Sequence, residues 1–182
     1  MAIHQNLKAL SEEVIDEYLA VARHCIADRK PDGGIYGYSA VLLLFCVVDA
    51  LSNHLGCPEH SFAVLNDPSF GLELSSAQLK NLKDWYRHLL AHVGMIAPGT
   101  MLTPETDGDA FEFSPTGQPT TIRVLPFYRI VEKAWKAFDR TRLRPEAHLK
   151  PKHIPVVPAD VMASTAMSFT ASGAPIPPTK KK

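Results

Sequence analysis

The chain has 182 residues, of which 46% are hydrophobic and 21% are charged, a composition typical of a globular protein and not of a disordered one. Its 19 Lys and Arg residues balance 19 Asp and Glu residues, so the formal net charge is zero. Proteins that bind nucleic acid through many phosphates are usually basic. Any contact with nucleic acid must therefore depend on a local patch or on a composite site.

The first half of the chain predicts two long helices. Apolar residues recur at three- and four-residue spacing in the first one, at Leu7, Leu10, Val14, Tyr18, Val21 and Cys25. The turn at 29–34 ends it, because proline and paired glycines cannot continue a helix cheaply. A second helix at about 35–55 is apolar nearly all round and should be central, with Gly56 as its C-terminal cap.

The second helix is predicted to be a core helix and not a membrane span. Its longest apolar run, 40–48, has nine residues and is ended by Asp49, whereas a bilayer needs about 20. No signal peptide is expected, because the chain begins with an amphipathic pattern. The cysteines Cys25, Cys46 and Cys57 are odd in number and lack CxxC spacing, which indicates reduced thiols in a cytoplasmic protein.

A third helix is predicted after an irregular segment, 56–74, that contains a short helical turn. Ser75 and Gln78 have the spacing of a capping box, and the helix should run to about Val93, where Gly94 closes it. Its core stripe is predicted at Leu79, Leu82, Tyr86, Leu89, Leu90 and Val93.

The remaining elements are a small hairpin, a fourth helix and a tail. Residues 111–124 alternate apolar and polar types around a Pro/Gly-rich turn, which predicts a β-hairpin. Pro126 fits the first turn of a helix whose apolar residues are Phe127, Ile130, Val131, Ala134, Trp135 and Phe138. The expected fold is an all-α bundle of four to five helices over 1–143, with the hairpin inserted at about 100–124. A Pro-rich, disordered tail follows at 144–182.

The third helix carries three polar side chains on one face. On a helical wheel Arg87, His88 and His92 lie away from the core stripe, and the small Ala91 lies between Arg87 and His92. Such residues are often simply solvated. The His88/His92 pair has the i,i+4 spacing of zinc helices, but the sequence has no HExxH, acidic third ligand nearby or cysteine pair. We therefore predict neither a metal nor another cofactor.

The segment from Arg87 to His92, RHLLAH, resembles the RxxxxH signature of HEPN domains, with His88 in the polar position after the arginine. The apolar helix that precedes it and the segment 94–102 that follows fit the same pattern, and the resemblance covers about 5–140. It implies an HEPN-like bundle and a homodimer whose composite site takes Arg and His from both subunits. The implied activity is that of a metal-independent endoribonuclease, toxin-like, with RNA as substrate and a cognate antitoxin as partner.

The chemistry of these side chains fits that role. Histidine titrates near neutral pH, so His92 would be the general acid/base that exchanges a proton with a ribose 2′-hydroxyl. Arg87 would hold phosphate oxygens with its planar fork, and His88 would support them. A two-fold axis passing by Ala91 would bring two such sets together.

Asp49 and the function itself each leave alternatives open. A carboxylate in an apolar helix is costly to bury unless it is paired. In one interpretation Asp49 faces a polar edge, caps a neighbouring backbone group or pairs with an arginine of the bundle. In the other, it contacts Arg87 and orients that side chain without touching the substrate itself. The alternative to a nuclease is a non-catalytic HEPN-like binding or regulatory module for a nucleotide, RNA or protein. A purely structural dimer, with the Arg/His face packed, is a third possibility.

Overall fold

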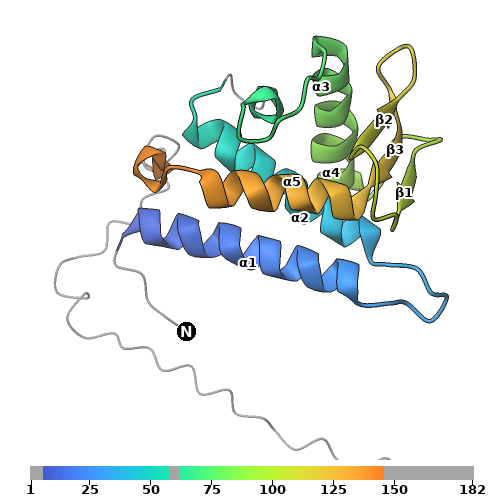
Figure 1. Ribbon diagram of the computed structural model, residues 1–182, viewed down its shortest axis with the longest axis horizontal. Helices are drawn as coiled ribbons and strands as arrows, with labels where there is room; N and C mark the ends of the chain where they lie inside the picture. The colour runs from blue at the N-terminus through green and yellow to red at the C-terminus, as the bar shows by residue number, and fades with distance from the viewer. Residues whose placement is uncertain (1–5, 58–61, 146–182) are drawn as a thin grey trace, which may run out of the picture. The chain divides into compact units, whose positions relative to one another are not determined.

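The computed structural model describes residues 6–57 and 62–145, apart from the side chains of 87–89. The helices are α1 (Leu7–Ala27), α2 (Gly37–His54), α5 (Val124–Ala137) and one continuous helix made of α3 (Ser76–Leu82), η2 (Lys83–Leu90) and α4 (Ala91–Val93) (Figure 1). Two 3₁₀ turns, η1 (Ala63–Asn66) and η3 (Arg140–Arg142), complete them. The expected helical class is confirmed in this part of the chain. Of the predicted tail, 146–182 lie outside the described residues.

The helix ends follow from local chemistry. The Ser75 hydroxyl accepts from the Gln78 backbone N–H at 3.3 Å, while the Ser75 N–H donates to Gln78 Oε1 at 2.7 Å, so the predicted capping box starts α3. Gly56 and Gly94 follow α2 and α4 with φ of 69° and 70°, a left-handed conformation that glycine adopts without a Cβ penalty.

The sheet is larger than the predicted hairpin. Strands β2 (Phe111–Phe113) and β3 (Pro119–Arg123) pair antiparallel, as the alternating pattern predicts, and Phe111 lies opposite Ile122. A third strand, β1 (Met101–Thr103), pairs parallel to β3 with Leu102 opposite Ile122, which gives the order β1-β3-β2. The prediction of a hairpin alone was wrong, because a three-residue strand that pairs with a segment 20 residues away has no local signature.

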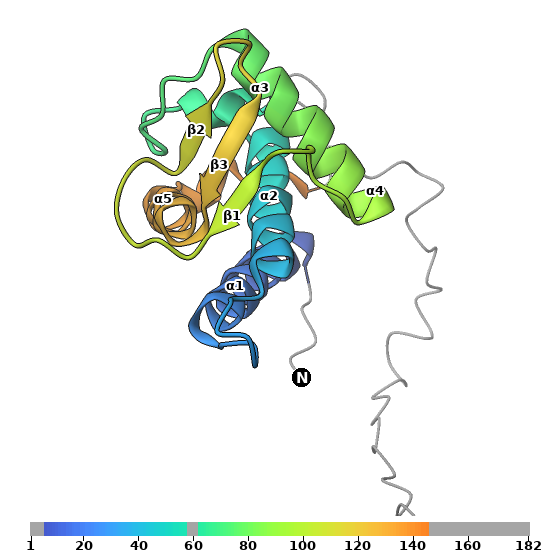
Figure 2. The ribbon, with the colours of Figure 1, turned by 90° about the vertical axis from the view of Figure 1, so that its right-hand side faces the viewer.

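Helix α2 lies at the centre of the fold, as predicted. It packs against α1, α5 and the α3–α4 helix, which surround it in Figure 2. Its buried side chains include Val41, Leu44, Phe45, Val48 and Leu51. By length and composition α2 is the one described helix that could cross a membrane, yet 56% of it is buried inside the protein. That burial is consistent with the core helix of a soluble protein.

The buried face of α1 differs from the predicted stripe. Its most buried residues are Ile15, Leu19 and Ala22, whereas Leu10 and Val21 are exposed. Both rows are apolar and lie about 100° apart on the helix. The sequence pattern did not determine which row faces α2 and α5, because that choice depends on the partners.

The third helix departs from α-geometry in its middle. Residues 83–90 (η2) form π-helical turns, in which each residue advances by less than the ~100° of an α-helix. Leu82, Tyr86 and Leu90 are buried as predicted, and Leu79 is partly buried. Val93 is 56% exposed, so its predicted core position was wrong. The smaller rotation through η2 turns Val93 out of the core stripe.

An aromatic cluster fills the space between α2 and its neighbours. The Phe45 ring lies with its centroid 4.9 Å from Phe127, 5.1 Å from Phe62 and 5.3 Å from Tyr86. Phe111 of the sheet lies 4.8 Å from Phe127 and extends the cluster to β2. The sheet, α2, α5 and the third helix are therefore held together through one set of rings.

Candidate functional site

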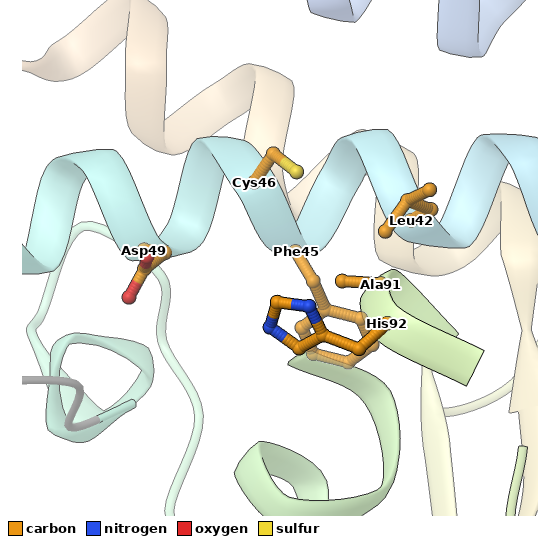
Figure 3. A pocket seen from close by; sticks show the side chains of 6 residues that line it. All are labelled: Leu42, Phe45, Cys46, Asp49, Ala91 and His92. Atoms are coloured by element: carbon orange, nitrogen blue, oxygen red, sulfur yellow. The ribbon is translucent and has the colours of Figure 1, made fainter. Parts of the chain in front are cut away.

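A pocket of about 210 Å³ lies between α2 and α4 (Figure 3). Residues of α2 form one wall and residues of α4 the other; together they are Leu42, Phe45, Cys46, Asp49, Ala91 and His92. The α2 residues share one face because they are spaced at three, four and seven positions. The pocket therefore brings together two predicted site residues, Asp49 and His92, that are 43 positions apart in the chain.

His92 lies on α4 at the edge of this pocket and is exposed. In Figure 3 its ring lies on the side of α2 that carries Asp49, and both it and Phe45 line the pocket. The wheel placed His92 away from the core stripe, and its exposure agrees with that. His92 is not merely a solvated side chain on the outer face of its helix, because its ring lines a pocket formed with the neighbouring helix α2.

Asp49 is half-buried, and its Oδ1 is shielded from solvent. It follows Phe45 by one helical turn, so both side chains face α4. In Figure 3 its carboxylate lies on the same side of α2 as the His92 ring. The pocket is thus lined by the Asp49 carboxylate, the His92 imidazole and the Phe45 ring.

Arg87 and His88 belong to η2, and their side chains lie outside the described part of the structure. The backbone nevertheless affects the motif. In an α-helix the positions of Arg87 and His92 are about 140° apart, and π-helical turns reduce that angle because they rotate less per residue. The RxxxxH segment begins in η2 and ends in α4. Arg87 and His92 are therefore separated by a smaller angle around the helix axis than in a regular α-helix.

Three exposed apolar side chains lie near the pocket residues in the chain. Tyr38 is 52% exposed and precedes Leu42 by one turn of α2, and Val93 and Met95 are 56% and 54% exposed one and three positions after His92. Exposed apolar groups that gather around a polar site are typical of a surface that binds a partner.

Tyr86 lies one turn before Leu90 and supports the pocket from the core. Its side chain is fully buried against Phe45, and burial raises the pKa of its hydroxyl to about 12. The neighbouring Thr100 side chain partly opposes that effect. Tyr86 therefore stays neutral at physiological pH and acts as a packing residue.

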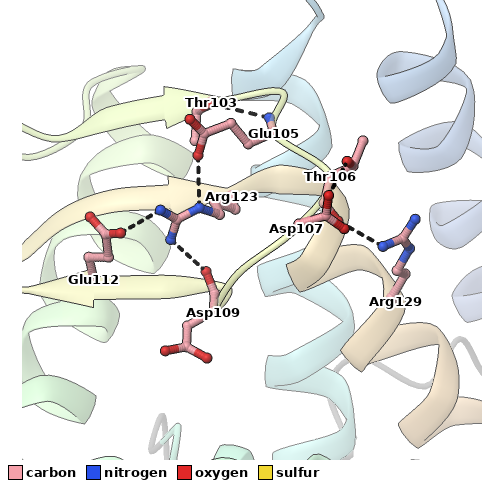
Figure 4. A network of polar contacts seen from close by, with 8 residues as sticks. All are labelled: Thr103, Glu105, Thr106, Asp107, Asp109, Glu112, Arg123 and Arg129. Atoms are coloured by element: carbon pink, nitrogen blue, oxygen red, sulfur yellow. Dashed lines mark hydrogen bonds and ion pairs between the residues drawn. The ribbon is translucent and has the colours of Figure 1, made fainter.

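A second polar cluster, centred on Arg123, holds the sheet and the loop before β2 (Figure 4). Its guanidinium donates to Glu105 Oε2 at 2.8 Å, to the Asp109 carbonyl at 3.0 Å and to Glu112. Hydrogen bonds from Arg123 and then Thr121 hold the pKa of Glu112 below its ordinary value. Among the residues that the structure describes, the Arg123 side chain donates only to this loop and to β2, so we assign the cluster a structural role.

The pocket walls contributed by α2 were missed by the sequence interpretation. Leu42, Phe45 and Cys46 share the face of Asp49, and that spacing was present in the sequence, but it does not reveal which helix faces it. Among the side chains that the structure describes, a set that does not include His88, no group of three or more His, Cys, Asp or Glu is arranged to hold a metal ion.

No family model, curated protein or solved structure matches this chain. The functional interpretation consequently depends on the geometry of the pocket and on the RHLLAH motif.

Proposed function

We propose that this protein is an HEPN-like, metal-independent endoribonuclease with a composite Arg/His site at a homodimer interface. His92 is the general acid/base, Arg87 holds the phosphate and His88 supports them. The proposed setting is the cytoplasm, with a toxin-like role and a cognate antitoxin as partner. The observation that supports the proposal best is that exposed His92 and half-buried Asp49 line one pocket.

The second subunit is part of the proposal for a physical reason. The described pocket walls carry one carboxylate and one imidazole but no lysine or arginine. A phosphodiester there needs cations, since negative charge builds on phosphorus during cleavage. Arg87 supplies one cation, and a two-fold axis beside Ala91 supplies the same residue from the second copy. The exposed Tyr38, Val93 and Met95 provide apolar surface for that contact.

Catalysis is tested by incubating the purified chain with single-stranded RNA in EDTA. We expect cleavage that His92→Ala abolishes, a loss of at least about 100-fold, because general acid/base catalysis contributes about 10²- to 10⁴-fold. His24→Ala is the matched control, since His24 is an exposed histidine on α1. If the His92 variant cleaves RNA as fast as the unaltered protein, the assignment is wrong. Nucleotide binding without cleavage would favour the non-catalytic module.

The composite site is tested by a substitution among the exposed apolar residues of the proposed interface, Tyr38, Val93 and Met95. Val93→Glu places a charge on the proposed interface without burying it in the core, because Val93 is 56% exposed. We expect sedimentation to show a dimer for the unaltered chain and a monomer, inactive on RNA, for this variant. Val21→Glu is the control, since Val21 is 42% exposed on α1. An active monomer would contradict the composite site.

A further inference from the structure

A second groove, of about 350 Å³, lies between α1 and α5. Figure 2 shows α1 and α5 on one side of α2 and α4 on the other, so this groove is separate from the His92 pocket. Cationic side chains come from both helices: Arg23 from α1, and Arg129 and Lys136 from α5. They share the groove with a single carboxylate, Glu132. In a chain of zero net charge this is a local excess of positive charge.

The carboxylate of Glu132 is already engaged. Its Oε2 pairs with Lys136 Nζ at 2.9 Å, and its Oε1 accepts from the Tyr128 hydroxyl at 2.9 Å. The hydrogen bond from Lys136, followed by that from Tyr128, lowers the pKa of Glu132. Lys136 and Glu132 therefore offset each other, and the uncompensated charge of the groove is that of the two arginines.

The two arginines are placed to act on a ligand. The Arg23 side chain is exposed and makes no hydrogen bond or ion pair with any residue that the structure describes, although its charge acts on Glu132 and Tyr128. Arg129 donates from Nη1 to the Thr106 carbonyl at 2.8 Å, which orients its guanidinium (Figure 4). A guanidinium has five N–H donors, so most of those on Arg129 remain available.

We propose that this groove binds a phosphate monoester, with the phosphate between Arg23 and Arg129. A phosphate offers three oxygens and up to two charges, which suits two planar guanidinium forks from different helices better than the single edge of a carboxylate. The groove volume exceeds that of a phosphate alone and reaches the lower end of small-molecule sites, about 300–1,000 Å³. Ile26 and Leu125 offer apolar surface to the carbon skeleton of the ester. This proposal does not depend on RNA cleavage.

The test uses the full chain labelled with ¹⁵N, in which the arginine Nε–H signals are followed by NMR. Inorganic phosphate and ribose 5-phosphate are titrated separately at constant ionic strength, with ribose as the phosphate-free control. We expect saturable shifts for both phosphates, tighter binding of the ester and no response to ribose. Arg23→Gln should weaken binding of the ester at least about tenfold, because charge-assisted hydrogen bonds to the phosphate are lost.

Lys133→Gln is the matched control, because Lys133 is exposed on α5 and does not line the groove. It removes the same charge and should change the affinity less than twofold. The absence of a saturable shift would overturn the proposal, as would equal weakening by both substitutions, which indicates diffuse attraction. Ester binding no tighter than that of inorganic phosphate would overturn the monoester assignment. A spectrum of Arg23→Gln that matches the unaltered fold shows that any loss arises in the groove.

Discussion

Replacement of Phe45 by leucine would test whether the aromatic cluster is the principal support of both the fold and the pocket. The Phe45 side chain is 1% exposed and lies within 6.4 Å, between ring centroids, of Phe62, Tyr86, Phe111 and Phe127. Among the described residues, no other side chain joins α2 to so many elements through ring contacts. Leucine keeps an apolar side chain at this position, so the substitution isolates the contribution of ring packing.

The expected loss of stability is about 2–4 kcal/mol. Favourable aromatic pairs contribute about 0.5–1.5 kcal/mol each beyond the area that they bury, and several of them are lost together. Removal of the whole ring, as in Phe→Ala, costs about 3–5 kcal/mol, which sets an upper limit for the milder change. Phe138→Leu is the control, because Phe138 is half-buried and, among the described residues, its ring stacks on Trp135 only, at 5.8 Å. We expect it to cost less than about 1.5 kcal/mol.

Urea unfolding followed by far-UV circular dichroism gives both free energies and the dependence of each on urea. An unchanged slope shows that the surface exposed on unfolding is the same and that the free energies can be compared directly. A cost for Phe45→Leu below about 1 kcal/mol, or equal to that of Phe138→Leu, would refute the argument that the ring cluster holds α2 in place.

Three further predictions concern single side chains. Because burial raises the pKa of Tyr86 to about 12, its neutral form stabilises the fold fully below pH ~10, and this contribution declines between pH ~10 and ~12. In urea unfolding at a series of pH values, Tyr86→Phe should lose less unfolding free energy between pH ~10 and ~12 than the unaltered protein. An equal loss in both proteins would contradict the prediction. Since Arg123 lowers the pKa of Glu112 below 4.5, the pair stabilises the sheet above that pH and loses this contribution as pH falls. Arg123→Gln should therefore make the unfolding free energy less dependent on pH in the acid range. If the variant and the unaltered protein show the same dependence on pH, the contribution of the Arg123–Glu112 pair is excluded. Ser75→Ala should cost about 1 kcal/mol of unfolding free energy by loss of the capping box, and a negligible change would contradict it.

Features encoded within a few neighbouring residues could be predicted from the sequence. The capping box at Ser75 and Gln78, the left-handed glycines at 56 and 94 and the β2–β3 turn all depend on local chemistry, and the structure confirms them. The central position of α2 was also predictable, because a helix that is apolar all round must be covered on several sides.

Features that depend on distant partners could not be predicted in this way. Strand β1 is defined by its pairing with β3, and the buried row of α1 is selected by the helices against which it packs. The π-helical turns of η2 have no signature in the apolar spacing, so an α-helical wheel placed Val93 in the core. The same wheel identified His92 as core-distal but could not show that α2 would face it.

The candidate site combines both kinds of information, and that combination limits what one chain can do. The RHLLAH motif is local, whereas Asp49 joins His92 only through the packing of α2 against α4. The described pocket walls then hold one acid and one imidazole, with no lysine or arginine to offset a phosphate. The free arginine charge described above lies in the α1–α5 groove, on the far side of α2. In the proposed nuclease site, a phosphodiester at His92 would take its cations from Arg87 and from the same residue of the second copy, so we expect Val93→Glu to lose the dimer and the cleavage together.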